Sequence, residues 1–255
     1  MSRLQHPSHI ISNRDVSHAP KVSPYAPNGL DCSVYIKDPA TECVIPEISE
    51  TITVSSPTRV VAGQTFDCKL AKYQHVDTSC NLEVEQGASS AVFILEEGAT
   101  LMNCFLGFSQ ESVHCPGECK IQNSHWLQVC DDAMMFHQPK GVSTISGCSF
   151  SNAGNKAVQF NGAGNINIEN TCFYNVDIGY RSCGTGCTGA SSEARSVSFK
   201  DIQIRGVNTL AGFNHKAGDT VTIGSTTGSP AKVMCKDKAQ QVAAGKLPVG
   251  CTISS

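Results

Sequence analysis

Charged residues, aromatic residues and long apolar runs are all scarce in this sequence, and each shortage excludes a class of protein. Charged residues make up 16% of the 255 residues and no Lys/Arg-rich run is present, which argues against a nucleic-acid partner. No apolar stretch approaches about 20 residues, so we expect no membrane-spanning helix. The net charge is only −3, and there is a single Trp. Gly is abundant instead, with 22 residues, which is typical of chains built from short strands and turns.

Fourteen cysteines are the strongest clue to the compartment. A zinc site would need C-x2-C pairs, whereas this chain has two Gly-rich C-x3-C pairs, at Cys115/Cys119 and Cys183/Cys187, without a matching pair of His. Structural disulfides are therefore favoured over a zinc site or free buried thiols, and disulfides indicate secretion. Because no apolar segment of a signal peptide follows residues 1–6, we expect that the signal has been removed from this sequence.

A short motif recurs through the middle of the chain: an apolar residue, any residue, Asn, Gly or Asp, two more residues, and a bulky apolar residue. Successive copies begin 20, 24, 23 and 31 residues apart, and a candidate sixth copy begins 24 residues later. Such a period indicates a solenoid, in which each unit buries its apolar face only by stacking on its neighbours. The copies begin at Leu101, Ile121, Ile145, Ile168 and Phe199, with the sixth at Ile223.

The composition divides the chain into three parts. Residues 1–50 are rich in Ser, Pro, His and Asn and predict an irregular extension or linker, with a small loop closed by Cys32 and Cys43. Residues 51–235 contain short β-branched runs separated by Gly, which predict the strands of one all-β domain. Residues 236–255 form a tail, with a candidate short helix at 238–242, tied down by Cys235 and Cys251. Three cysteines inside the repeat are candidates for small buried core residues: Cys104, Cys148 and Cys172.

Three acidic residues, Glu111, Asp131 and Asp132, are spaced for a common site. Positions 20 to 21 residues apart lie about one coil apart in such a solenoid, so Glu111 is expected to lie beside the Asp pair. Ca²⁺ binds six to eight oxygen atoms, and carboxylates from separate coils would supply several of them. Three clustered carboxylates would otherwise repel one another and partly protonate. The alternative is an ordinary solvated acidic face, since adjacent Asp residues are common at turns.

Two isolated cations follow the acidic cluster in the sequence. Lys156 comes about one coil after the Asp pair, and Arg181 comes 25 residues, about one further coil, after Lys156. Taken singly, Lys156 is typical of a surface turn and Arg181 of a residue capping a disulfide loop. Taken together with calcium they offer a different chemistry. The metal binds a substrate carboxylate and acidifies the neighbouring proton, a basic side chain removes that proton, and a guanidinium neutralises the developing charge. A Lys serves as that base only if its pKa is lowered by nearby positive charge. This combination suits β-elimination on a uronic acid polymer.

Six blocks carry a resemblance to the pectate lyases of polysaccharide lyase family 3: residues 92–101, 113–119, 129–133, 156–164, 180–184 and 211–220. Their order and spacing resemble the family over roughly residues 52–235. The resemblance implies a right-handed parallel β-helix and a secreted, Ca²⁺-dependent enzyme, which we expect to be a monomer. Its substrate would be de-esterified homogalacturonan (polygalacturonate), cleaved to 4,5-unsaturated oligogalacturonates. It also places the family's calcium ligands on Glu111, Asp131 and Asp132, and its catalytic cations on Lys156 and Arg181.

The sequence departs from that family pattern at four positions. Glu111 stands where Asp is usual and Asp131 where Glu is usual, while Gln128 replaces an acid and Phe160 replaces a His. One alternative is therefore a catalytically weak or inactive pectin-binding homologue, although few aromatic residues are available for a binding platform. Another is a β-helical glycoside hydrolase, which would use Asp131 and Asp132 as acid and base around a water. The Gly-His-Gly sequence expected of such a hydrolase is not obvious here.

Overall fold

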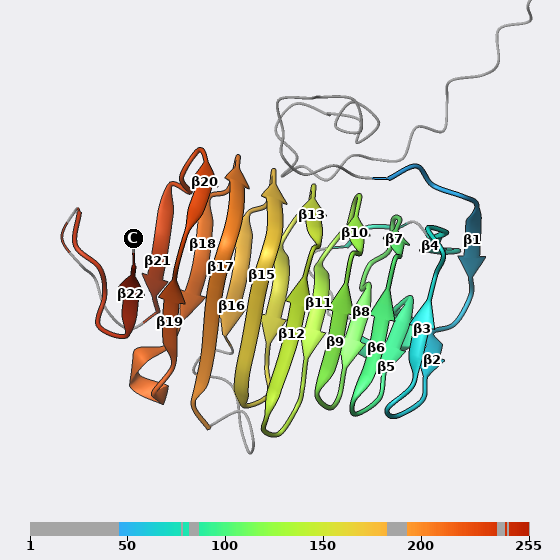
Figure 1. Ribbon diagram of the computed structural model, residues 1–255, viewed down its shortest axis with the longest axis horizontal. Coiled ribbons are helices and arrows are strands. Elements are labelled where there is room, and N and C mark those ends of the chain that lie inside the picture. Colours follow the sequence, from blue (N-terminus) through green and yellow to red (C-terminus); the bar gives the residue numbers. More distant parts are fainter. Residues whose placement is uncertain are drawn as a thin grey trace, which may run out of the picture.

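The protein is a stack of short parallel strands wound around one long core, with the N-terminal coils at one end and β22 at the other (Figure 1). The computed structural model describes residues 46–77, 79–81, 87–182, 193–238, 243 and 245–254. All strand pairs in this part of the chain are parallel, and each strand pairs with strands of neighbouring coils. Two short 3₁₀ helices, η2 (Gly87–Ser90) and η4 (His215–Ala217), lie between strands. This arrangement is a parallel β-helix.

One wall of the helix is an eight-stranded sheet that carries the candidate site. Its strands follow one another in chain order, one from each coil. They are β2 (Thr58–Val60), β5 (Phe93–Leu95), β8 (Val113–Cys115), β11 (Asp132–Phe136), β14 (Lys156–Phe160), β16 (Ile178–Ser182), β18 (Thr209–Phe213) and β21 (Val233–Asp237). We call this sheet the site wall.

The other two walls belong to a single 14-stranded sheet, because β15 and β17 run without interruption across both. One of these walls contains β3 (Thr65–Asp67), β6 (Ala99–Met102), β9 (Cys119–Gln122), β12 (Val142–Ser146), β19 (Thr220–Ile223) and β22 (Cys251–Ile253). The other contains β1 (Thr51–Val54), β4 (Lys72–His75), β7 (Phe105–Leu106), β10 (His125–Trp126), β13 (Ser149–Ser151) and β20 (Thr226–Gly228). The two long strands are β15 (Gly164–Tyr174) and β17 (Arg195–Arg205).

The repeat found in the sequence coincides with the register of these walls. Its first positions form one continuous row of paired residues from Leu101 to Ile223, and its last positions form a second row from Leu106 to Ile204. The third position explains the restriction to Asn, Gly or Asp. In the first five copies this residue has a positive φ, between 46° and 67°, a conformation that Gly, Asn and Asp tolerate best. The predicted solenoid is confirmed.

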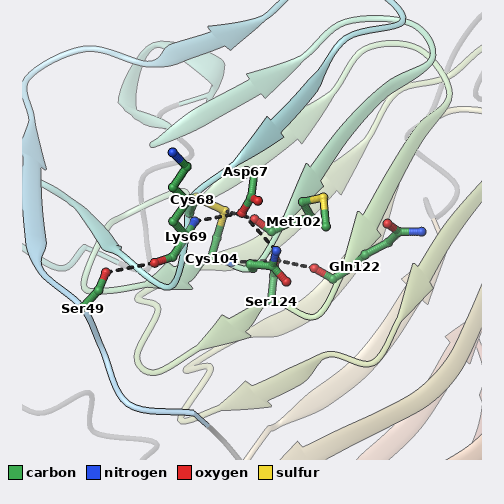
Figure 2. The surroundings of a disulfide bond; sticks show 9 residues. Ser49, Asp67, Cys68, Lys69, Met102, Cys104, Gln122 and Ser124 are labelled. Carbon is green, nitrogen blue, oxygen red and sulfur yellow. Dashed lines mark hydrogen bonds between the residues drawn. A yellow bond between two sulfur atoms is a disulfide. The ribbon is translucent and has the colours of Figure 1, made fainter.

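Figure 2 shows how the turn around one of these left-handed residues, Asn103, is held together. Cys68, just after β3, forms a disulfide with Cys104, between β6 and β7 of the next coil. Next to this disulfide, the Asp67 carboxylate accepts hydrogen bonds from the Lys69 backbone N–H at 2.8 Å and from the Asn103 side-chain amide at 3.0 Å. The left-handed residue Asn103 is therefore fixed by its side chain as well as by its backbone. The disulfide adds a covalent link between two coils that strand pairing and the Asp67–Asn103 hydrogen bond already join.

The core is filled by matching side chains stacked from coil to coil. Trp126 stacks on Phe150 with ring centroids 4.6 Å apart, and Phe150 stacks on Phe173 at 5.4 Å. All three side chains are fully buried. Each pair of stacked aromatic rings contributes about 0.5–1.5 kcal/mol beyond the burial of its area. Packing of this kind makes each coil depend on its neighbours, as the sequence repeat implied.

The cysteines bear out the prediction of disulfides. Within the described residues nine cysteines are disulfide-bonded, including Cys104, Cys172 and the predicted pair Cys235–Cys251. The tenth described cysteine, Cys148, is free; burial raises its pKa to about 12, so it serves as a small core residue. The predicted Cys32–Cys43 loop, the predicted extension up to residue 45, and most of the candidate helix at 238–242 lie outside the described residues. Strand β22, from the predicted tail, pairs with β19. No helix in the described part of the chain is both long and apolar enough to cross a membrane.

The buried His125 makes the stability of this stack depend on pH. Its ring lies 5.2 Å from that of Phe105 and shares a hydrogen bond with Ser149 Oγ at 2.9 Å. Burial lowers the pKa of His125 from 6.5 to about 4. Between these values the unfolded chain binds the proton more readily, so stability falls as the pH drops from 6.5 to about 4. We expect a loss of about 3 kcal/mol from this group. Urea unfolding at both ends of the range should show that loss in the wild type and not in His125→Gln; equal pH slopes in the two proteins would contradict it.

Candidate active site

The three predicted acids lie together at the edge of the site wall where its strands begin. Glu111 lies in the turn before β8, Asp131 immediately precedes β11, and Asp132 is the first residue of β11. The backbone holds them in adjacent coils, because Asp131 N–H donates to Gln110 O at 3.0 Å and Ser112 N–H donates to Asp132 O at 3.2 Å. Glu111 thus lies one coil from the Asp pair, as its spacing predicted. All three side chains are buried.

A disulfide and a pair of hydrogen bonds fix the two turns that carry these acids. Cys130, next to Asp131, is bonded to Cys80 of an earlier coil. Beside it, the Gln110 side chain accepts from Asn81 N–H at 2.9 Å and donates to Asn81 O at 2.8 Å. The segment at residues 79–81 therefore anchors both turns from outside. Fixed turns hold the carboxylates in place despite their mutual repulsion.

Lys156 joins the acidic cluster through a buried ion pair. Its Nζ lies 2.9 Å from Asp132 Oδ1 and 3.5 Å from Asp131 Oδ1. The strand register explains this contact, since Lys156 is the first residue of β14 and pairs directly with Asp132. The Asn155 side-chain amide also donates to Asp131 Oδ1, at 2.6 Å. The predicted base and two of the predicted metal ligands thus form one unit.

The remaining charges of the cluster act on Asp132. Burial raises the pKa of this carboxyl well above its ordinary value; the charges of Asp131 and Glu111 act in the same direction, and Lys156 opposes them. His114 Nε2 lies 3.3 Å from Glu111 Oε2, which joins the cluster to the middle of β8. A buried carboxylate in this setting gains from any neighbouring cation.

Arg181 lies in the coil next to Lys156 but further along its strand. Lys156 pairs with Ile178, whereas Arg181 pairs with Gln159. Three residues of strand correspond to about 10 Å, so the two cations are separated along the wall. Arg181 lines a cavity of about 450 Å³ with Lys236 and Lys238. In the described ranges it forms no ion pair with an acidic side chain.

Comparison with known proteins identifies the family of this site. A family model described as pectate lyase matches residues 42–242. The chain belongs to the pectate lyase family. It is 36% identical to a probable pectate lyase D of Neosartorya fischeri over 184 residues, 72% of this chain and 75% of the relative. It is 38% identical to a probable pectate lyase E of the same fungus, over 75% of this chain and 73% of the relative.

Solved structures of pectate lyases share the fold. The catalytic domain of the pectate lyase PelI from Erwinia chrysanthemi aligns with a TM-score of 0.55 at 17% identity, covering 82% of this chain and 98% of the domain. The same enzyme in complex with tetragalacturonic acid aligns with a TM-score of 0.50, covering 85% of this chain and 71% of that one. The predictions of a parallel β-helix and of a pectate lyase enzyme are therefore confirmed.

The pectate lyase family raises the question of whether these acids suit calcium. Their donors are carboxylate oxygens, which Ca²⁺ prefers. Asp132 Oδ2 is buried and has no hydrogen-bond partner among the described residues, so it is available to a cation. The donor chemistry therefore fits. Within the same residues, however, no group of three or more His, Cys, Asp and Glu side chains converges closely enough to form a ready metal site. Calcium binding stays a prediction.

Two of the departures from the pectate lyase pattern differ in their distance from the candidate site. Phe160 is fully buried and packs edge-on against Phe136 in the core, so it does not alter the outer surface of the site wall. Gln128 is half-buried before Cys130, in the turn that leads to Asp131. Sequence reasoning missed the parts played by His114 and Asn155. Their positions, three residues after Glu111 and directly before Lys156, were the available signals.

Proposed function

We propose that this member of the pectate lyase family is a secreted, Ca²⁺-dependent enzyme that cleaves de-esterified homogalacturonan by β-elimination, releasing 4,5-unsaturated oligogalacturonates. The observation that carries the proposal is the buried unit of Asp131, Asp132 and Lys156 beside Glu111. Such a unit, at the edge of a wall with cavities, matches what elimination requires: anionic oxygens for a cation and a basic side chain next to them. The relative solved with tetragalacturonic acid supports the same class of substrate.

In this proposal each side chain has a separate task. Glu111, Asp131 and Asp132 would hold calcium, which when bound would neutralise a substrate carboxylate and make the adjacent ring proton more acidic. Lys156 removes that proton from C5, the electron pair left behind forms the C4–C5 double bond as the C4–O bond to the neighbouring unit breaks, and the departing oxygen takes a proton from water. Lys156 must first leave its ion pair with Asp131 and Asp132 and give up its own proton, since an ammonium cannot act as a base. Arg181, in the neighbouring coil, binds the uronate carboxylate or the charge that develops on it.

The ion pair also weighs against the glycoside hydrolase alternative. A hydrolase of that type needs two carboxyl groups on opposite sides of the scissile bond, with room for water between them. Asp131 and Asp132 are consecutive and both contact Lys156 Nζ. They are therefore held against the same ammonium group, which suits cation binding better than paired acid and base chemistry.

Replacing Asp132 tests the metal part of the proposal. Asp132→Asn keeps the volume of this buried side chain but removes the charge, so the Ca²⁺ concentration for half-maximal activity should rise at least about tenfold. Calcium titration calorimetry should show the same loss of affinity, and thermal unfolding should confirm that the variant is folded. Glu50→Ala, an exposed acid next to β1, provides the control and should leave both quantities unchanged. Unaltered calcium dependence in Asp132→Asn would remove Asp132 from the metal site.

A further inference from the structure

Eight residues form a single row across the outer surface of the site wall, one from each strand. The strand pairings connect them without a break, and they alternate along each strand with core residues such as Phe93, Met134 and Val158. The row therefore faces away from the core, with neighbours about 4.8 Å apart. Its four central members, Ile94, His114, Met135 and Gln159, are themselves nearly inaccessible to solvent. In order from β2 to β21 it consists of Arg59, Ile94, His114, Met135, Gln159, Arg181, Gly212 and Lys236.

Two cavities divide this row into two arms. The first, of about 580 Å³, is lined by the four row residues of β2, β5, β8 and β11, together with Pro116 and others; we call it the N-terminal arm. The second, of about 450 Å³, is lined by the three row residues of β16, β18 and β21, together with Lys238 and others; we call it the C-terminal arm. Gln159, in the strand of Lys156, lies between the arms in the row. A linear ligand following the row would thus cross both cavities, with the acidic cluster and Lys156 three residues, about 10 Å, back along the strands.

The C-terminal arm carries an excess of positive charge. Arg181 is half-buried, and Lys236 and Lys238 are exposed. One acid, Asp177, also lines this cavity, and its carboxylate accepts a hydrogen bond from the Asn208 side chain at 2.7 Å. Arg181 and Lys236 are two coils apart in the row, about 10 Å. This spacing allows the two cations to contact carboxylates on different units of one polyanionic chain.

The N-terminal arm has a different character. Its floor is apolar, formed by Ile94, Met135 and Pro116. Among the described residues that line this arm, the one Arg, Arg59, is ion-paired with Glu96 at 3.7 Å, His114 contacts Glu111, and the ring of His137 lies 6.2 Å from that of His114. The arm therefore offers apolar surface and little uncompensated positive charge. No lysine lines this arm among the described residues, so a uronate carboxylate would find little positive charge there, whereas a methyl ester would bury its methyl group against the apolar floor.

We propose that the two arms select a partly esterified galacturonan by where its free carboxylates and its methyl esters lie along the chain. Units that lie across the C-terminal arm must carry free carboxylates, because an ester there would leave Lys236 and Lys238 without anionic partners. Units that lie across the N-terminal arm can be methyl-esterified. The inference rests on the proposed function, since it takes a galacturonan as the ligand. It goes beyond that function by assigning ester tolerance to one side of the acidic cluster and a carboxylate subsite to the other.

The carboxylate subsite is tested by binding, separately from cleavage. In a Lys156→Met background, which prevents turnover in the proposed mechanism, Lys236→Ala/Lys238→Ala should weaken calorimetric binding of an unesterified galacturonate hexamer by about five- to tenfold. The salt dependence of binding should also decrease, because fewer charges are neutralised. The matched control is Lys120→Ala/Lys200→Ala, which removes two exposed lysines from the 14-stranded sheet and should bind as its parent does. Equal binding by both double variants would overturn the subsite.

The direction of ester tolerance is tested on products. Partly esterified galacturonan is digested with the wild-type enzyme, and ester positions in the fragments are mapped by mass spectrometry. We expect unesterified units next to the cleaved bond on the side that lay in the C-terminal arm, and methyl-esterified units only on the side that lay in the N-terminal arm. Lys236→Ala/Lys238→Ala should reduce this difference between the two sides. Ile94→Lys, which adds a cation to the N-terminal arm, should lower the ester content there. Esters distributed equally on both sides would overturn the proposal. Cleavage of no galacturonan, with lysine-dependent binding intact, would instead reject the lyase function and leave the carboxylate subsite standing.

Discussion

Lys156→Ala is expected to lower kcat on polygalacturonate by about 10²- to 10⁴-fold while changing substrate affinity far less. Losses of that size are typical when a general base is removed. The structure gives a reason to focus on this residue, because Lys156 is the cation that lies within 3.5 Å of both Asp131 and Asp132. Steady-state kinetics at saturating calcium would separate the effect on kcat from the effect on KM.

The same ion pair dictates the controls. Removing Lys156 leaves buried carboxylates without their partner, so the variant could lose stability as well as activity. Lys156→Met, which keeps most of the volume, and thermal unfolding of each variant distinguish these causes. Lys156→Arg should restore activity only in part, because a guanidinium is almost never deprotonated. A Lys156→Ala enzyme with nearly normal kcat, beside an inactive Arg181→Ala enzyme, would exchange the roles of the two cations.

Asp219→Ala is expected to destabilise the fold by about 3–5 kcal/mol, because it leaves a buried charge without its partner. Asp219 Oδ1 accepts from the Arg195 backbone N–H at 3.0 Å and from its guanidinium at 3.3 Å. The second oxygen accepts from Asn214 N–H at 3.2 Å. Both side chains of the pair are inaccessible to solvent, so water cannot replace the lost contacts. Equilibrium urea unfolding would measure the change.

A double-mutant cycle separates the ion pair from the packing around it. Replacing both partners by apolar residues often costs much less than breaking a buried pair. The double variant Arg195→Met/Asp219→Leu should therefore be more stable than the sum of its two single variants predicts. If the single substitutions each cost under about 1 kcal/mol, or if their effects simply add, the pair does not stabilise the fold in the way its burial suggests.

The fold could be predicted from the sequence because one repeated constraint governs every coil. The apolar residues Leu101 and Ile121 must stack to be buried, and the residues two positions later, Asn103 and Asn123, must adopt a left-handed backbone. Both requirements restrict the residue types at these positions, so the repeat can be recognised in the sequence. The pairing of cysteines between coils could not be predicted from residue types in this way. Cys68–Cys104 and Cys80–Cys130 connect cysteines 36 and 50 residues apart, and only the register of the coils brings them together.

The candidate site could be predicted less completely, for a related reason. Coil spacing placed Glu111 beside Asp131 and Asp132, and the structure agrees. Spacing alone could not show that Lys156 pairs with Asp132, whereas Arg181 is offset by three residues along its strand, since loop lengths between coils vary. The outward row from Arg59 to Lys236 could not be predicted from the sequence for the same reason. Its members are separated by irregular intervals, and only the sheet register aligns them.

The central claim is calcium-dependent elimination, and one measurement tests it most directly. The protein is incubated with polygalacturonate while the ultraviolet absorbance of the unsaturated uronide product is followed, first with calcium and then with an excess of a strong chelator. The proposed function predicts that absorbance rises with calcium, stops rising on chelation and resumes when calcium is restored in excess. Absorbance that continues undiminished in the chelator would contradict the role of the metal, and new saturated chain ends without absorbance would contradict elimination itself.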